Sequence, residues 1–223
     1  MWLSRYETGS ATWYICGAEL PTPQLYIREL CMSSPAQKRY TAEEYLALER
    51  QAQYKSEYCA GEIFAMAGAS RWHNLIVANV IGELRLQLKG RPCTTYPSNM
   101  RVKISPTGLY TYPDVTVVCG EAQFEDTRQD TLLNPTLIVD VLSESTEAYD
   151  RGGKFAHYRK LPTLLEYVLI TQTKPHIEHY IRQPDHRWLL EEAEGLHGTV
   201  HFPAIDCHLS LAEAYDKVDI VVT

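Results

Sequence analysis

Apolar side chains recur at helical spacing in one long segment of the chain. They stand at positions 72, 75, 76, 80, 84 and 88, which is the spacing of one face of an amphipathic helix. The pattern predicts a helix over residues 71–89, and Gly90 is a typical stop. A shorter helix is predicted over residues 42–53, because Thr41 and Glu44 have the spacing of a capping box.

Other segments have the alternating or continuous apolar pattern of strands. Residues 56–68 predict a strand pair that turns at Gly61. Residues 112–119 and 135–143 are apolar and β-branched almost throughout, which is typical of central strands covered on both faces. Strands are also predicted within 93–104 and at 165–171, and a hairpin is predicted over 174–194 with its turn at 183–185. The segment 120–134 is predicted to be a polar and mobile loop. A helix is predicted over 145–162 with an inner stripe of Phe155, Tyr158 and Leu161, and a short helix over 208–218.

These elements predict an α/β protein with one domain over residues 37–223. Residues 1–36 show no sustained period and are predicted to be an N-terminal extension. The chain has 45% hydrophobic and 22% charged residues, as globular proteins do. It contains neither a long apolar run nor the basic start of a signal peptide, so a cytoplasmic location without membrane contact is expected.

Charge and cysteine content narrow the classes of function. A net charge of −7 disfavours a protein that coats nucleic acid regardless of sequence. The six cysteines form no C-x-x-C pair and fit no zinc motif. Cys59, Cys93 and Cys119 lie in or beside apolar segments, so the prediction is free, mostly buried thiols in a reducing compartment.

Two aspartates interrupt the apolar strands, Asp114 after Pro113 and Asp140 between valines. A charge buried alone is costly, so each carboxylate needs a partner, a metal or a place at a cleft. If the two strands are neighbours, both carboxylates can bind one hard cation. Such a cation lowers the pKa of bound water and favours hydrolysis of a phosphodiester. Two simpler interpretations stay open: Asp114 binds turn amides, and Asp140 pairs with Arg151 or Arg159.

Several segments together resemble a known family. Pro113-Asp114 followed by Asp140-Val-Leu-Ser resembles the PD-(D/E)xK nucleases. The run from 135 to 170 is more closely similar to the Uma-type endonucleases, as are Tyr58-x-x-Gly61-Glu62-Ile63 and the helix that opens with His73 and Asn74. The resemblance covers roughly residues 40–215.

This resemblance implies a restriction-endonuclease-like core, in which a mixed central sheet is flanked by helices. The hairpin predicted over 174–194 is expected as an added C-terminal β-hairpin. The resemblance also implies Asp114 and Asp140 as ligands of Mg²⁺ or Mn²⁺, DNA as substrate and a homodimer as assembly. The superfamily lysine falls at position 142, where this chain has Leu142, and Lys154 takes its place in the Uma-type pattern.

Weaker candidates and alternatives remain. Glu62 is a candidate third carboxylate, and His73 a candidate ligand or phosphate contact. Lys154 is also four residues from Asp150, the spacing of an ordinary surface ion pair. His176 and His179 point to opposite faces of a strand and are not expected to share a metal. A nuclease fold that has lost its chemistry and serves as a binding or structural module is the alternative function.

Overall fold

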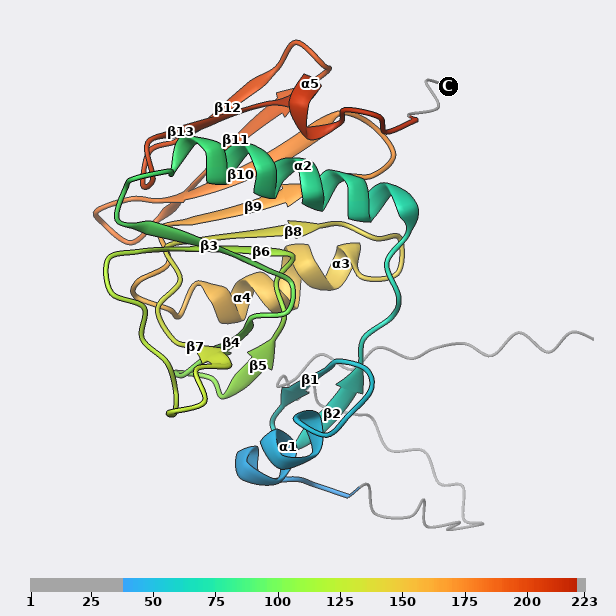
Figure 1. The fold of residues 1–223 in the computed structure, drawn as a ribbon, viewed down its shortest axis with the longest axis vertical. Coiled ribbons are helices and arrows are strands. Elements are labelled where there is room, and N and C mark those ends of the chain that lie inside the picture. Colours follow the sequence, from blue (N-terminus) through green and yellow to red (C-terminus); the bar gives the residue numbers. More distant parts are fainter. Residues whose placement is uncertain (1–37, 220–223) are drawn as a thin grey trace, which may run out of the picture. The chain divides into compact units, whose positions relative to one another are not determined.

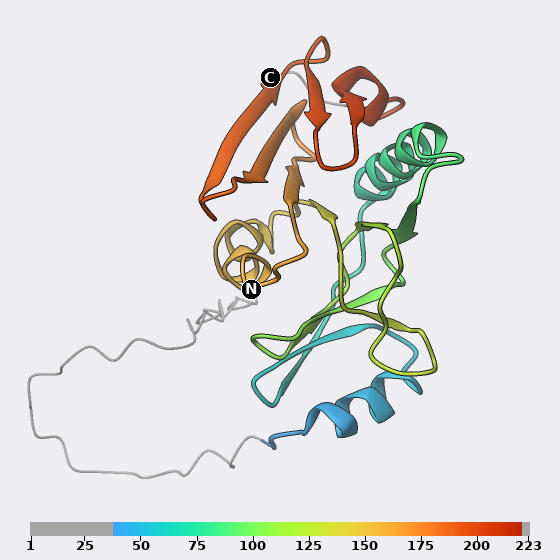
Figure 2. The same cartoon turned by 90° about the vertical axis from the view of Figure 1, so that its left-hand side faces the viewer.

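A computed structural model describes residues 38–219 of the protein. The predicted extension over residues 1–36 lies outside the described residues, as do Cys16 and Cys31. Figures 1 and 2 both place α1 and the β1–β2 hairpin at one end of the described part and the β12–β13 hairpin with α5 at the other. None of the helices in residues 38–219 combines the length and the apolar character that a membrane span requires.

The larger sheet has six strands in the order β11-β10-β9-β8-β6-β3. The pairing of β8 with β9 is parallel and the other pairings are antiparallel, so the sheet is mixed, as predicted. Every residue of β8 is buried, which confirms a central strand covered on both faces. The strands are β3 (Cys93–Pro97), β6 (Val115–Cys119), β8 (Leu137–Val141), β9 (Glu166–Ile170), β10 (His176–Arg182) and β11 (Trp188–Glu194).

Helices cover both faces of this sheet (Figure 1). On one face α2 (Arg71–Gln87) packs its buried residues against the odd-numbered residues of β6 and β8. On the other face α3 (Glu147–Tyr149), a π-helical turn η1 (Asp150–Lys154) and α4 (Phe155–Tyr158) pack against the even-numbered ones. The predicted inner stripe of Phe155, Tyr158 and Leu161 is buried. The predicted single helix is divided into three short pieces, and the glycines in η1 lie at this division.

The smaller sheet has the order β2-β1-β5-β4-β7. Thr41 and Glu44 form the predicted capping box of α1, although the helix ends at Glu49 rather than near residue 53. The expectation of a plain mobile loop over 120–134 is wrong, because that segment contains β7 and its aspartates bind Arg50. The elements are α1 (Ala42–Glu49), β1 (Ser56–Cys59), β2 (Glu62–Ala65), β4 (Arg101–Ile104), β5 (Leu109–Thr111) and β7 (Thr131–Leu132).

The C-terminal part differs from the prediction in its details. The predicted hairpin over 174–194 is formed by β10 and β11 and extends the larger sheet. A separate two-stranded hairpin follows, with β12 (Thr199–Phe202) and β13 (Cys207–Ser210). The predicted helix over 208–218 is shortened to α5 (Leu211–Ala214), because its first residues pair as a strand.

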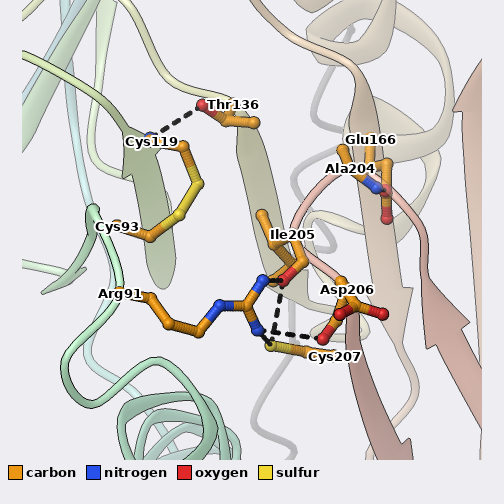
Figure 3. Close-up of a disulfide and its surroundings, with 9 residues drawn as sticks. All are labelled: Arg91, Cys93, Cys119, Thr136, Glu166, Ala204, Ile205, Asp206 and Cys207. Atoms are coloured by element: carbon orange, nitrogen blue, oxygen red, sulfur yellow. Dashed lines mark hydrogen bonds between the residues drawn. A yellow bond between two sulfur atoms is a disulfide. The ribbon is translucent and has the colours of Figure 1, made fainter.

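The prediction that Cys93 and Cys119 are free thiols is wrong. The two residues are direct partners in the β3–β6 ladder and form a disulfide. Directly opposed residues of an antiparallel pair bring their Cβ atoms within reach of such a bond. Figure 3 shows the disulfide near Arg91, whose guanidinium donates to the carbonyls of Ile205 and Asp206. The disulfide therefore ties the edge strand β3 to the interior of the larger sheet.

Candidate active site at the end of strands β6 and β8

Asp114 and Asp140 are neighbours across two paired strands. Val115 is paired with Val139 in antiparallel register, so Asp114 and Asp140 occupy the next opposed positions and share a face. The amide of Val141 donates to Oδ2 of Asp114 at 2.8 Å. The expectation that the two acidic strands are adjacent is confirmed.

Lys154, which lies in η1, contacts Asp140 and Asp150. Its Nζ lies 3.2 Å from Oδ2 of Asp140 and 3.4 Å from Oδ1 of Asp150. The pair with Asp150 therefore exists, but it is buried and shared with Asp140 instead of lying on the surface. Leu142, which stands where the superfamily lysine is usual, is buried in the core. The Uma-type pattern thus locates the lysine that contacts Asp140.

The two arginines considered as partners of Asp140 have other contacts. Arg151 donates to Glu178 and Glu147, and Arg159 lies over the ring of Phe155. Asp140 instead accepts a hydrogen bond of 2.9 Å from the hydroxyl of Tyr167. The role of Tyr167 was not predicted, because a tyrosine in an apolar strand is ordinarily a core residue.

Burial and crowding of carboxylates set the protonation behaviour of the site. Burial is the main cause that raises the pKa of Asp140; Lys154 opposes it, the charges of Asp150 and Asp114 add to it, and together they bring this pKa to about 7. Burial acts to lower the pKa of Lys154, but the carboxylates of Asp140 and Asp150 outweigh it and raise that pKa well above its ordinary value. Negative charge is thus in excess around one buried ammonium group, a condition that attracts a cation.

His73 reaches the site from the first turn of α2. Ser70 is the N-cap, and its hydroxyl accepts from the amide of His73. The Nε2 atom of His73 lies 3.1 Å from Oδ2 of Asp114. Its Nδ1 is buried and has no hydrogen-bond partner in the described part of the chain. Capping of α2 therefore positions the histidine against Asp114, as expected for a residue of the site.

Glu62 does not join this cluster. Its carboxylate lies at the turn of the β1–β2 hairpin and pairs with Arg39 at 3.1 Å. The neighbouring strand provides Glu57 instead, whose Oε1 is 3.9 Å from Nζ of Lys154 and accepts from the hydroxyl of Thr111. The sequence showed two glutamates on one hairpin and gave no signal that favoured Glu57, because the choice depends on packing against η1.

The residues present fit a hard divalent cation. Across residues 38–219, Oδ1 of Asp114 and Oδ1 of Asp140 accept no hydrogen bond, since the contacts of both carboxylates fall on Oδ2. Mg²⁺ is commonly held by one or two carboxylates and completes its shell with water. The pair could therefore bind Mg²⁺ or Mn²⁺ through these oxygens, with Glu57 and Asp150 adding negative charge nearby.

The fold and these residues define a class of protein: a mixed sheet flanked by helices, with two aspartates on adjacent strands and a lysine in contact with one of them. A crystal structure described as a putative nuclease belonging to DUF820, from Anabaena variabilis, has this fold. It matches with a TM-score of 0.65 and 18% identity, over 80% of this chain and 99% of that one. The chain therefore shares the mixed α/β fold of that structure.

Sequence comparison identifies the family. The Uma2 family model, described as "Putative restriction endonuclease", matches residues 42–212, and the chain belongs to this family. Two relatives from Synechocystis are each described as an uncharacterized protein. One, sll1609, is 42% identical over 74% of this chain and 93% of its own length. The other, slr1290, is 39% identical over 68% of this chain and 79% of its own length.

Proposed function

We propose that the protein is an endonuclease that hydrolyses DNA phosphodiester bonds with Mg²⁺ or Mn²⁺. The observation that carries the proposal is the pairing of Asp114 with Asp140 on adjacent strands, with Lys154 in contact with the second carboxylate. Membership of a family described as "Putative restriction endonuclease" supports the same chemistry.

In this proposal each side chain has a distinct task. Asp114 and Asp140 hold the cation, and His73 fixes the carboxylate of Asp114. The cation, when bound, supplies a water whose pKa is low enough for attack near neutral pH. Lys154 orients the attacking water and stabilises the charge that develops on the phosphate. Glu57 and Asp150 keep the ammonium of Lys154 charged and in place.

The setting of the reaction is part of the proposal. The net charge of −7 favours a protein that contacts DNA at a limited site rather than along a long basic surface. Nucleases of this fold that cut both strands of a duplex often pair two active sites, so we infer a homodimer with a symmetric interface. A DNA substrate also favours a cytoplasmic location. The disulfide argues against that location, because disulfides are rare in reducing compartments.

A cleavage assay tests the proposal. Purified protein is incubated with plasmid and with single-stranded DNA in Mg²⁺ or Mn²⁺, and the products are separated on gels. We expect cleavage that a chelator abolishes and that falls at least about a hundredfold in Asp114→Asn and Asp140→Asn. Asp185→Asn, in the β10–β11 turn, is the matched control and should cleave like wild type. Cleavage that survives the chelator and both site variants would overturn the proposal.

The alternative, a nuclease fold without activity, is favoured by one observation. Lys154 is buried among carboxylates, and an apolar leucine stands at the usual lysine position. In that case the wild-type protein would leave DNA intact at every metal concentration. Binding of DNA in a gel-shift assay, unchanged by Asp140→Asn, would then support a binding module.

A further inference from the structure

A second group of potential metal ligands lies on β10 and β11. One ligand atom each of His176, Glu178 and Glu192 lies within 4.8 Å of the other two. Among residues 38–219, these three form the group of His, Cys, Asp and Glu side chains that could hold a metal ion. His176 and Glu178 are two apart on one strand and therefore share a face. Glu192 is the direct cross-strand partner of Glu178.

His176 is buried and incompletely bonded. Its side chain is 7% exposed, and its Nε2 lies 3.1 Å from Glu192 and 3.7 Å from Glu194. Its Nδ1 is buried and has no hydrogen-bond partner among the described residues. A buried nitrogen without a partner is costly, and Nε2 of the same ring is the atom that lies beside the carboxylates of Glu192 and Glu194.

The carboxylate of Glu178 is held in a fixed orientation. Arg151 donates to its Oε1 through Nε at 2.9 Å and Nη2 at 2.6 Å, and the hydroxyl of Tyr180 donates to its Oε2 at 3.1 Å. Carboxylates that bind metals are commonly oriented by such outer hydrogen bonds. Glu178 is thus pre-organised, while Glu192 is exposed and free to adjust.

The group is separate from the aspartate pair, although it lies on the same face of the sheet. Asp140 and Glu178 are both register partners of Leu169, on β8 and β10 respectively. Two strand spacings correspond to about 10 Å, which is too far for one ion to be shared. Leu169 is buried between the two groups.

We propose that His176, Glu178 and Glu192 form a second cation site that binds a transition metal ion of the zinc type. An imidazole together with carboxylates suits Zn²⁺, whereas an all-oxygen site suits Mg²⁺. The site differs in donor chemistry from the aspartate pair, so the two sites bind different metals. A vacant position on the ion would be filled by water, because Glu192 faces solvent.

Zinc titration of the full chain without an affinity tag tests this second site. Calorimetry is carried out on the Asp140→Asn protein, in which the aspartate pair is disabled, and on this protein with Glu192→Gln or Glu191→Gln added. Glu192 and Glu191 are both exposed and adjacent, but they point to opposite faces of the sheet. We expect Zn²⁺ to bind and raise the melting temperature in the Asp140→Asn background. Glu192→Gln should weaken binding about tenfold or more, and Glu191→Gln should not change it.

Three results would overturn the proposal. They are the absence of Zn²⁺ binding in the Asp140→Asn background, equal Zn²⁺ binding in Glu191→Gln and Glu192→Gln, and a melting temperature that Zn²⁺ leaves unchanged. Equal binding in both glutamate variants would assign the zinc to another group, such as His201 and His208, whose rings stack at 4.5 Å. None of these results bears on DNA cleavage, so the second site and the proposed nuclease activity are tested independently.

Discussion

At the scale of single residues, the site is a balance between one ammonium group and several carboxylates. Lys154 contacts Asp140, Asp150 and Glu57 within 3.9 Å. A buried charge needs compensation, and removal of one partner leaves the others uncompensated. Burial, with a smaller contribution from the neighbouring carboxylates and against the charge of Lys154, raises the pKa of Asp140 to about 7.

This raised pKa makes stability depend on pH in a defined direction. The carboxyl of Asp140 has an ordinary pKa of 3.8 and a folded pKa of about 7. Its contribution to the free energy of unfolding is fully present below pH 3.8 and is lost as the pH rises through about 7. With chelator present, we expect wild type to lose stability relative to Asp140→Asn across this range, measured by urea unfolding at a series of pH values.

Asp185→Asn is the control for the pH series. The exposed carboxyl of Asp185 has a lowered pKa, because the side chain and the amide of Arg187 donate hydrogen bonds to it. Its stability relative to wild type should therefore not show the same trend. A flat difference between wild type and Asp140→Asn from pH 4 to 8 would mean that Asp140 is not perturbed in the folded protein.

At the scale of elements, the β1–β2 hairpin decides which glutamate serves the site. Glu57 and Glu62 lie on paired strands, yet only Glu57 approaches Lys154, while Glu62 pairs with Arg39. The two residues are a matched pair of the same chemistry on one hairpin.

Substitution of each glutamate tests this difference. We expect Glu57→Gln to lower the rate of Mn²⁺-dependent DNA cleavage about tenfold or more, because the environment of Lys154 loses a charge. Glu62→Gln should change the rate less than twofold, since an exposed ion pair contributes little. The rates are measured at saturating Mn²⁺. A larger loss in Glu62→Gln than in Glu57→Gln would restore Glu62 as the third carboxylate.

The link between β3 and β6 is a second feature at this scale. The disulfide joins residues with a sequence separation of 26, which corresponds to about 3.5 kcal/mol from reduced chain entropy in the unfolded state. We expect Cys119→Ser to lower the free energy of unfolding by that amount, and dithiothreitol to have the same effect on wild type. Addition of dithiothreitol to Cys119→Ser should have little further effect.

Peptide mapping without reduction checks the pairing itself. A peptide pair linked through Cys93 and Cys119 should appear in wild type. Alkylation of both cysteines in the unreduced, unfolded protein would show that the bond is absent and would return them to the free thiols that the sequence indicated.

At the scale of the whole molecule, local sequence patterns predicted most elements and part of the site. The capping box of α1, the amphipathic face of α2 and the apolar strands β6 and β8 are properties of short segments. Strand β7 and the disulfide depend on pairing between distant residues, for which a single sequence holds little signal. Asp114 and Asp140 could be named in advance because they interrupt apolar strands, and Lys154 because of the family resemblance, whereas Glu57 and Tyr167 carry no such signal.

The measurement that tests the site most directly is diffraction from crystals of the protein soaked in Mn²⁺, with data collected at the manganese absorption edge. An anomalous peak bonded to carboxylate oxygens of both Asp114 and Asp140, and lost in crystals of Asp114→Asn, is the expected result. Saturating Mn²⁺ that produces no peak between these two side chains would contradict a shared cation and the nuclease chemistry that depends on it.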